Sequence, residues 1–237
     1  MRLNKKMLAV TAILAVGILA GCGSSSASST ASSAVSSAPA SSAAASSEAE
    51  QTGAVQPIEQ GSLEDMKTEN YKFAADITAI KDGQVSMEVY SYDAYEKDGI
   101  DNLQVGDTIR THLDGADDAQ DVTVESVEKN TETGYISING GVEQGGVDLC
   151  LDHDVYRTIT MDGYPVYYKV GELTLPLADD VTMEDSSADP QASAVESDGA
   201  AAVEQAFNAD PDYWVCNNTT IFTDGGRVSN IVRVWVP

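Results

Sequence analysis

Basic residues are scarce in this chain of 237 residues. Only 13 Lys and Arg stand against 38 Asp and Glu, which leaves a formal net charge of -25. Three bases lie within residues 1–22 and no acid precedes residue 48, so the chain beyond residue 47 carries 10 - 38 = -28. Nucleic-acid affinity comes largely from Lys and Arg side chains that neutralise phosphates. The deficit of bases therefore excludes a duplex-binding protein.

The motifs of common enzyme classes are also missing. The chain has no Gly-x-Ser-x-Gly, no His-Glu-x-x-His, no Cys-x-x-Cys and no phosphate-binding glycine loop. We therefore expect no cofactor and predict a binding or interaction module without catalysis. The alternative is a cell-surface hydrolase that acts on glycans through acidic residues. It stays open because such carboxylates need proximity in space rather than in sequence.

One acidic run has the length of a calcium loop. Asp114 and Glu125 are placed like the first and last ligands of an EF-hand. However, Ala116 and Ala119 stand where that loop needs a ligand and a glycine. We therefore interpret the run as a solvated turn and predict no metal ligands.

No apolar run is long enough to span a membrane. The run Met7–Gly21 follows three positive charges and has 15 residues, short of the roughly 20 that a spanning helix needs, so it is typical of a secretory signal. It ends at Leu19-Ala20-Gly21-Cys22, which resembles the lipobox of bacterial lipoproteins. The resemblance implies a signal peptide over 1–21, a diacylglyceryl group on Cys22, and a bacterial cell-membrane location facing outside the cytoplasm.

Charge and aromatic side chains are absent from residues 23–47, where 13 Ser and 8 Ala are found. Such a segment cannot bury enough apolar surface to offset its chain entropy. We predict a disordered tether over residues 22–66, beginning at the lipidated cysteine. It would hold an acidic domain clear of the membrane surface.

Short alternating runs separated by Gly, Asp and Asn begin after residue 66 and are typical of strands. Runs 72–80 and 84–92 flank Asp82-Gly83, a strong hairpin signal. With runs 108–113, 121–127 and 134–139 and a Val-Gly-Asp corner at 105–107, they resemble small OB-like barrels. This resemblance implies a β subdomain over residues 67–140.

A second β subdomain is predicted over residues 141–237, with a loop at 184–210 that includes a short helix at 200–208. In its last strand, Val228, Val232 and Val234 are expected to face one way and Ile231 the other. The fold class is therefore mainly β, a small antiparallel barrel or sandwich, OB-like in one interpretation. It has at most one short helix and follows the disordered N-terminal tether.

Two cysteines remain beyond Cys22. Cys150 and Cys216 lie in the second predicted subdomain, and outside the cytoplasm such a pair can form a disulfide. Two free thiols fit the spacing equally well, because sequence separation does not determine distance.

Aromatic side chains provide the candidate binding surface. Tyr90, Tyr92, Tyr156 and Tyr167 are expected on strand faces opposite the aliphatic residues. Exposed tyrosines stack on sugar rings or anchor a protein partner, so we expect an envelope glycan or a protein as partner besides the membrane. The alternative is packing in half-buried strands, which is the commoner role of tyrosine there.

Overall fold

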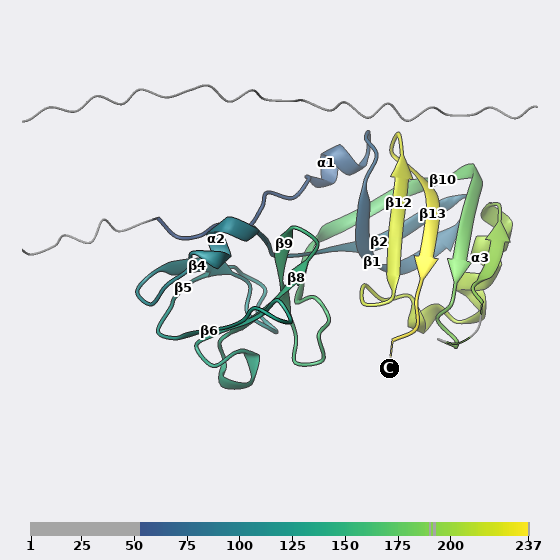
Figure 1. The fold of residues 1–237 in the computed structure, drawn as a ribbon. Coiled ribbons are helices and arrows are strands. Elements are labelled where there is room, and N and C mark those ends of the chain that lie inside the picture. Colours follow the sequence, from purple (N-terminus) through teal and green to yellow (C-terminus); the bar gives the residue numbers. More distant parts are fainter. Residues whose placement is uncertain (1–52, 190, 192, 237) are drawn as a thin grey trace, which may run out of the picture. The chain divides into compact units, whose positions relative to one another are not determined.

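The computed structural model describes residues 53–189, 191 and 193–236 and is built mainly from β-strands (Figure 1). The predicted signal peptide 1–21, Cys22 and residues 23–52 of the predicted tether lie outside the described residues. Residues 53–66 were also predicted to be disordered, but they are part of the fold: Val55 pairs with Ile109, and residues 63–66 form a helical turn. The strands are β1 (Lys72–Lys81), β2 (Gln84–Tyr92), β3 (Ala94–Glu96), β4 (Thr108–Thr111), β5 (Gln120–Thr123), β6 (Val127–Asn130), β7 (Tyr135–Ile138), β8 (Val147–Asp152), β9 (Val155–Ile159), β10 (Tyr167–Asp185), β11 (Val195–Asp198), β12 (Thr219–Asp224) and β13 (Arg227–Arg233). The helices are α1 (Leu63–Met66), α2 (Lys97–Asp101) and α3 (Ala200–Ala209), and 3-10 turns lie at Val142–Gln144 and Pro211–Tyr213.

Five strands form a closed ring in the order β1-β2-β10-β13-β12 and back to β1, here called the ring. Every seam is antiparallel except β10–β13, which is parallel. An odd number of strands cannot close with every neighbour antiparallel, so one parallel seam is required. Strand β11 pairs only with the end of β10 and lies outside the ring.

Strand β10 closes the ring because it is long enough to serve two neighbours. Its first half, Tyr167–Pro176, pairs with β2, and the rest, from Leu177, pairs with β13. The register shifts between Leu177 and Thr182, where the strand passes from one neighbour to the other. Such irregular pairing bends a strand, as a closed ring needs.

The strands between β2 and β10 form a second body of structure, residues 94–166, here called the insert. Strands β3-β9-β8-β7-β6 make an antiparallel sheet of five strands, and β4 and β5 make a separate pair. Most neighbours in the insert are also consecutive in sequence. All described residues belong to one compact unit.

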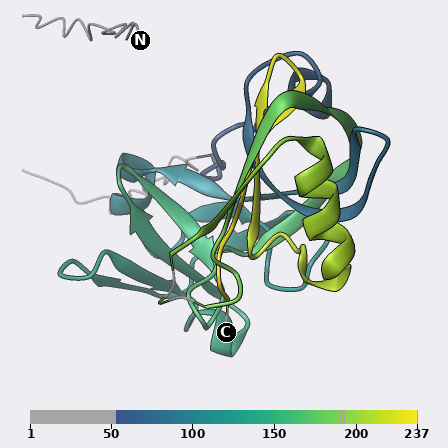
Figure 2. The same ribbon diagram turned by 90° about the vertical axis from the view of Figure 1, so that its right-hand side faces the viewer.

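Each body has its own apolar core. The ring encloses buried side chains that include Val85, Met87 and Val89, the face of β2 predicted to be apolar. Helix α3 packs on β1 and β10 through Val203 and Phe207, and Figure 2 shows it in yellow-green beside the ring. The insert core contains the buried residues Tyr95, Ile100, Leu103, Ile109, Val124, Ile136, Ile138, Val147, Leu149 and Tyr156.

The mainly β fold class predicted from the sequence is confirmed, and α3 lies where a short helix was predicted. The hairpin is also as predicted, with Asp82 and Gly83 at φ 53° and 72°. Two further helices, α1 and α2, are single turns of 4 and 5 residues. Among the helices of the described chain, none is long and apolar enough to cross a bilayer.

The grouping of strands differs from the sequence interpretation. The runs at 108–113, 121–127 and 134–139 do not close with β1 and β2. Strands far along the chain, β10, β12 and β13, take those places in the ring. Strands on both sides of residue 140 pair in one sheet, as β7 does with β8. Local patterns predict where strands lie, whereas long-range pairing decides which of them join.

Candidate functional site

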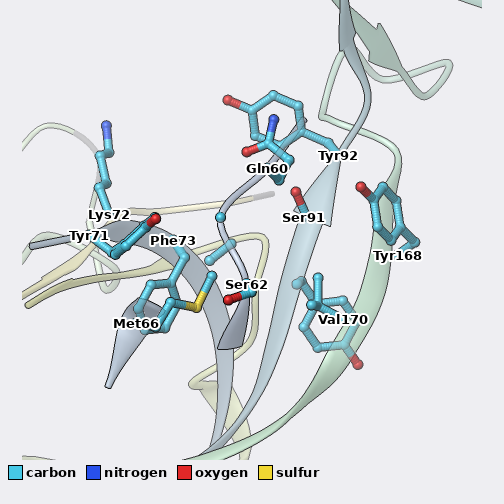
Figure 3. A pocket seen from close by; sticks show the side chains of 13 residues that line it. Gln60, Ser62, Met66, Tyr71, Lys72, Phe73, Ser91, Tyr92, Tyr168 and Val170 are labelled. Atoms are coloured by element: carbon cyan, nitrogen blue, oxygen red, sulfur yellow. The ribbon is translucent and has the colours of Figure 1, made fainter. Parts of the chain in front are cut away.

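A hollow of about 410 Å³ lies where β2 ends, beside β1 and the start of β10. In the view of Figure 3, Gln60, Lys72 and Tyr92 lie toward one end, and Met66, Phe73 and Val170 lie toward the other. The hollow is thus lined by both polar and apolar side chains. Its lining consists of Gln60, Gly61, Ser62, Met66, Tyr71, Lys72, Phe73, Ala74, Tyr90, Ser91, Tyr92, Tyr168 and Val170.

A second hollow of about 320 Å³ adjoins the first. Both are bordered by the same four residues, Lys72, Phe73, Ala74 and Tyr92. The remaining lining of the second hollow comes from both bodies of the structure and consists of Asp152, Arg157, Pro165, Tyr167 and Thr220.

Strand alternation explains why tyrosines gather here. Because Val85, Met87 and Val89 face the core, the even-numbered residues of β2, including Tyr90 and Tyr92, are only partly buried. Tyr167 lies directly opposite Tyr92 in the β2–β10 register. Their rings meet edge to face, 5.9 Å apart between centroids, a favourable arrangement for aromatic pairs.

The chain that leads into the fold forms one wall of the first hollow. Ser62 caps α1 reciprocally with Asp65: its hydroxyl accepts from the Asp65 amide, and its own amide donates to the Asp65 carboxylate. The preceding residue, Gly61, lies so close to the ring of Tyr71 that a Cβ would collide with it. The glycine and the cap together hold this wall against the aromatic lining.

Three phenol groups of the site, those of Tyr90, Tyr167 and Tyr168, have raised pKa values. Burial raises the pKa of Tyr167 to about 12. Burial also raises the pKa of Tyr168, and it raises that of Tyr90 together with the nearby Asp76 carboxylate. The Tyr90 hydroxyl donates to Glu88 Oε2 at 3.2 Å. Protonated phenols can donate hydrogen bonds, so the lining combines apolar rings with donors.

One of the four predicted tyrosines does not belong to this surface. Tyr156 is 5% exposed and packs in the insert core. Its hydroxyl donates to Asp101 Oδ1 at 3.0 Å. The expectation that it faces outward is wrong because α2 packs against β9 and Tyr156 belongs to the insert core. The structure brings together Tyr90, Tyr92 and Tyr167 and separates Tyr156 from them.

Both described cysteines are free thiols that are partly buried. Burial raises the pKa of Cys150, and it raises that of Cys216 to about 12 with help from the Asp76 carboxylate. Neither residue lines either hollow. Both thiols nevertheless lie near site residues: after burial, Cys216 contributes to the raised pKa of Tyr90 and Tyr167, and Arg157 opposes the effect of burial on the pKa of Cys150.

Carboxylates do not converge in the two hollows, where Asp152 is the one acidic lining residue. Elsewhere, Glu88 and Glu172 border a shallow depression and both bind the ammonium of Lys169, at 2.8 and 3.2 Å. The hydrogen bond from Lys169 lowers the pKa of Glu88, the opposite of what a general acid needs. Within the described residues, no three His, Cys, Asp or Glu side chains are grouped to hold a metal ion.

A buried polar cluster lies beside the first hollow. Asp93 is 1% exposed and accepts hydrogen bonds from the backbone amide of His112 at 2.6 Å and from the hydroxyl of Thr111 at 3.2 Å. The His112 ring also contacts this carboxylate at 3.1 Å and stacks on Tyr168, with centroids 3.6 Å apart. The cluster ties the insert to the ring and supports one wall of the hollow.

Sequence reasoning missed Tyr168, Lys72 and Arg157. Tyr168 follows a residue that was selected, but the strand period placed it on the opposite face. Lys72 and Arg157 are single charges in strands, and nothing in the sequence distinguishes them from surface residues. No family model, curated protein or solved structure was found to match the chain.

Proposed function

We propose that the protein is exported, anchored through a lipid on Cys22, and binds a glycan of the cell envelope without converting it. The observation that carries the proposal is the pair of adjoining hollows lined by Tyr90, Tyr92, Tyr167 and Tyr168. Aromatic rings stack on the apolar faces of sugars, and protonated phenols donate to sugar oxygens. Adjoining hollows suit a chain of sugar units better than one compact molecule.

We further propose that the ring is an OB-like barrel whose connection between its second and third strands has been extended into the insert. Support comes from the five-stranded closure, the single parallel seam, and α3 lying between the third and fourth ring strands. OB-like barrels bind oligosaccharides and oligonucleotides on the face of their second and third strands. Those strands here are β2 and β10, which carry the tyrosines, and the charge of -28 disfavours oligonucleotides.

The binding proposal is tested with the full-length protein, purified in detergent and applied to an array of neutral and acidic glycans. We expect concentration-dependent binding to part of the array. Tyr92→Ala should weaken it at least about tenfold, because removing a central aromatic anchor commonly costs that much. Tyr213→Ala is the matched control, since Tyr213 is 65% exposed and lines neither hollow.

Circular dichroism before each measurement shows whether the variants are folded. Equal losses for Tyr92→Ala and Tyr213→Ala would place the binding outside the hollows. Turnover of a bound glycan would instead support the hydrolase alternative. Crosslinking on intact cells then identifies the natural ligand, and recovery of a protein alone would replace the glycan by a protein partner.

The anchor has its own test. Intact-mass analysis of the membrane fraction should find a chain that begins at Cys22 and carries a diacylglyceryl group. Cys22→Ser should release the protein from that fraction, because the thioether needs the thiol sulfur. A mature chain without the lipid would remove the anchor from the proposal and leave glycan binding to be judged separately.

A further inference from the structure

Lys72 has fewer polar partners than the other Lys and Arg residues of the described chain. Ten Lys and Arg residues lie beyond residue 47, and eight of them form ion pairs. A ninth, Lys129, donates to three backbone carbonyls. Lys72 has neither kind of partner within the described residues. Its ammonium lies 5.7 Å from the centroid of the Phe222 ring and borders both hollows.

Arg157 is ion-paired but lacks a hydrogen-bond acceptor for its buried Nε. Its side chain is only 21% exposed, and its Nε lies 3.5 Å from Asp152 Oδ2. The buried Nε has no hydrogen-bond acceptor. Elsewhere in the described chain, Arg110, Arg227 and Arg233 each donate at least one hydrogen bond of 3.0 Å or less. A buried guanidinium without such bonds is costly unless something else satisfies it.

The two cations line the same hollow, the second one, together with a single carboxylate, Asp152. The formal charge of that lining is 2 - 1 = +1, in a region of the chain whose net charge is -28. The Asp152 carboxylate already has two partners: His153, whose Nδ1 lies 2.7 Å from Oδ1, and Arg157. An anion entering the hollow would therefore find cations with unused donors.

We infer that the second hollow binds a carboxylate carried on a sugar ring, so that the ligand is an acidic glycan. The inference rests on the proposed function and specifies its ligand class. Arg157 offers a planar fork that matches a carboxylate, and Lys72 offers a point charge. Tyr92 and Tyr167, paired at the border, supply the surface on which the sugar ring stacks. A lining charge of +1 is balanced by one negative charge, and Asp152 repels a second.

The test compares acidic oligosaccharides built from hexuronic acids with the same oligosaccharides after reduction of each carboxyl group to an alcohol. The two probes share ring and linkage and differ in charge alone. Full-length protein is titrated with both by calorimetry. We expect the uronate form to bind at least about tenfold more tightly, equivalent to 1.4 kcal/mol.

Variants locate that preference. Lys72→Gln and Arg157→Gln should each weaken uronate binding about tenfold and leave the reduced form within about twofold. Lys81→Gln is the matched control, because Lys81 is an exposed strand lysine that lines neither hollow. Lys72 is exposed, so its variant stays informative even if Arg157→Gln fails to fold.

Each of the other outcomes would contradict either the inference about the carboxylate or the proposed function. If uronate and reduced forms bind equally and the variants change nothing, the inference fails while glycan binding stands. If no member of either set binds, the proposed function fails as well. A phosphorylated sugar or a single-stranded oligonucleotide that binds more tightly than the uronate, and depends on Lys72, would replace the carboxylate as the ligand group.

Discussion

The ring and the insert are both β structures, but the ring strands have 6–19 residues and the insert strands only 3–6, and the two bodies are assembled in different ways. In the insert, β6, β7, β8 and β9 pair in the order in which they occur. In the ring, β1 and β2 pair with strands that follow the insert, and β10 closes it through two neighbours. Bringing distant segments together costs chain entropy before contacts form, so ring closure should be the slower event.

The junction between the two bodies explains how one chain accommodates both. The chain leaves the ring at Tyr92 and returns at Tyr167, which are direct partners across the β2–β10 seam. The ends of the insert are therefore neighbours, the arrangement that lets a fold accept an inserted segment. The candidate site lies at this junction and takes residues from both bodies.

The largest difference in stability between the ring and the insert is expected when the core of one of them is damaged. Trp214 is 1% exposed in the ring core, with the Phe207 ring 5.5 Å away and the Arg233 guanidinium 4.3 Å away. Trp214→Ala should lower the free energy of unfolding by about 3–5 kcal/mol. Urea unfolding followed by circular dichroism measures the loss. Hydrogen exchange should be accelerated more in the amides of the ring than in those of Ile136 and Ile138 in the insert.

The neighbouring exposed residue gives the control, because Tyr213→Ala removes little packing and should cost less than about 0.5 kcal/mol. Equal acceleration of exchange in ring and insert after Trp214→Ala would mean that the two cores unfold as one unit. The ring and the insert would then differ in topology and not in stability.

A smaller loss is expected where the bodies are joined. Asp93→Asn weakens the acceptor shared by the His112 amide and the Thr111 hydroxyl. Hydrogen bonds to charged groups contribute about 1.5–3 kcal/mol, and urea unfolding should show a loss in that range. Asp162→Asn, at an exposed turn, is the control. If both variants lose the same small amount, Asp93 does not couple insert to ring.

The two cysteines allow a chemical comparison, since Cys150 lies in the insert and Cys216 precedes β12 of the ring. Burial and Asp76 raise the pKa of Cys216 to about 12, whereas the Arg157 guanidinium opposes the effect of burial at Cys150. The thiolate is the reactive form, so near pH 8 Cys216 should alkylate at least about tenfold more slowly than an exposed cysteine in a short peptide, and more slowly than Cys150. Peptide-resolved mass spectrometry on a Cys22→Ser protein measures both rates.

Resistance of both thiols to alkylation until a reductant is added would establish the disulfide instead.

The raised pKa of Cys216 also makes the stability of the fold depend on pH. Folding favours the protonated thiol of Cys216, so its stabilising contribution is complete below 9.0, the ordinary pKa of a cysteine thiol, and is lost as pH rises toward about 12. Urea midpoints measured over this interval should fall less in Cys216→Ser than in the parent.

The smallest effects are expected at turns. Gly83 has φ 72° and open space around its Cα, so Gly83→Ala should cost about 1 kcal/mol for the left-handed backbone alone. Gly134, between β6 and β7 of the insert, has φ 70°, and a Cβ there would also come within 2.8 Å of Leu151 Cβ. Gly134→Ala should therefore lose more in urea unfolding; equal losses would mean that Leu151 moves aside easily.

The sequence was most informative where structure is local. The alternation in β2 placed Val85, Met87 and Val89 in the core, and the Asp82-Gly83 turn followed from its tolerance of positive φ. It failed in β13, where Val228 and Ile231 are both buried although they were expected on opposite faces. The register shifts at this point, since Phe222 pairs with Asn230 but Thr223 pairs with Val228, and one extra residue reverses the faces.

The candidate site was only partly predictable for a related reason. The alternation of side chains along each strand identified Tyr90, Tyr92 and Tyr167, because the partial burial of these residues depends only on the period of their own strand. Tyr156 has the same pattern but is covered by α2, a contact that the strand period does not contain. Lys72 and Arg157 line the same hollow only because the insert returns to the ring. Their shared position therefore depends on the tertiary structure and could not be predicted from strand patterns.

The wall formed by Gln60, Gly61 and Ser62 has a mechanical consequence. These residues are the last part of the chain before α1, and they line the first hollow. In a protein held at its N-terminal end, a pull between that end and a ligand in the hollow first meets the backbone hydrogen bonds of Val55 with Thr108 and Arg110 in the insert, and then this wall. Once those bonds give way, tension would act on the hollow before it reaches the strands of the ring, so attachment of the chain and the shape of the hollow depend on neighbouring residues.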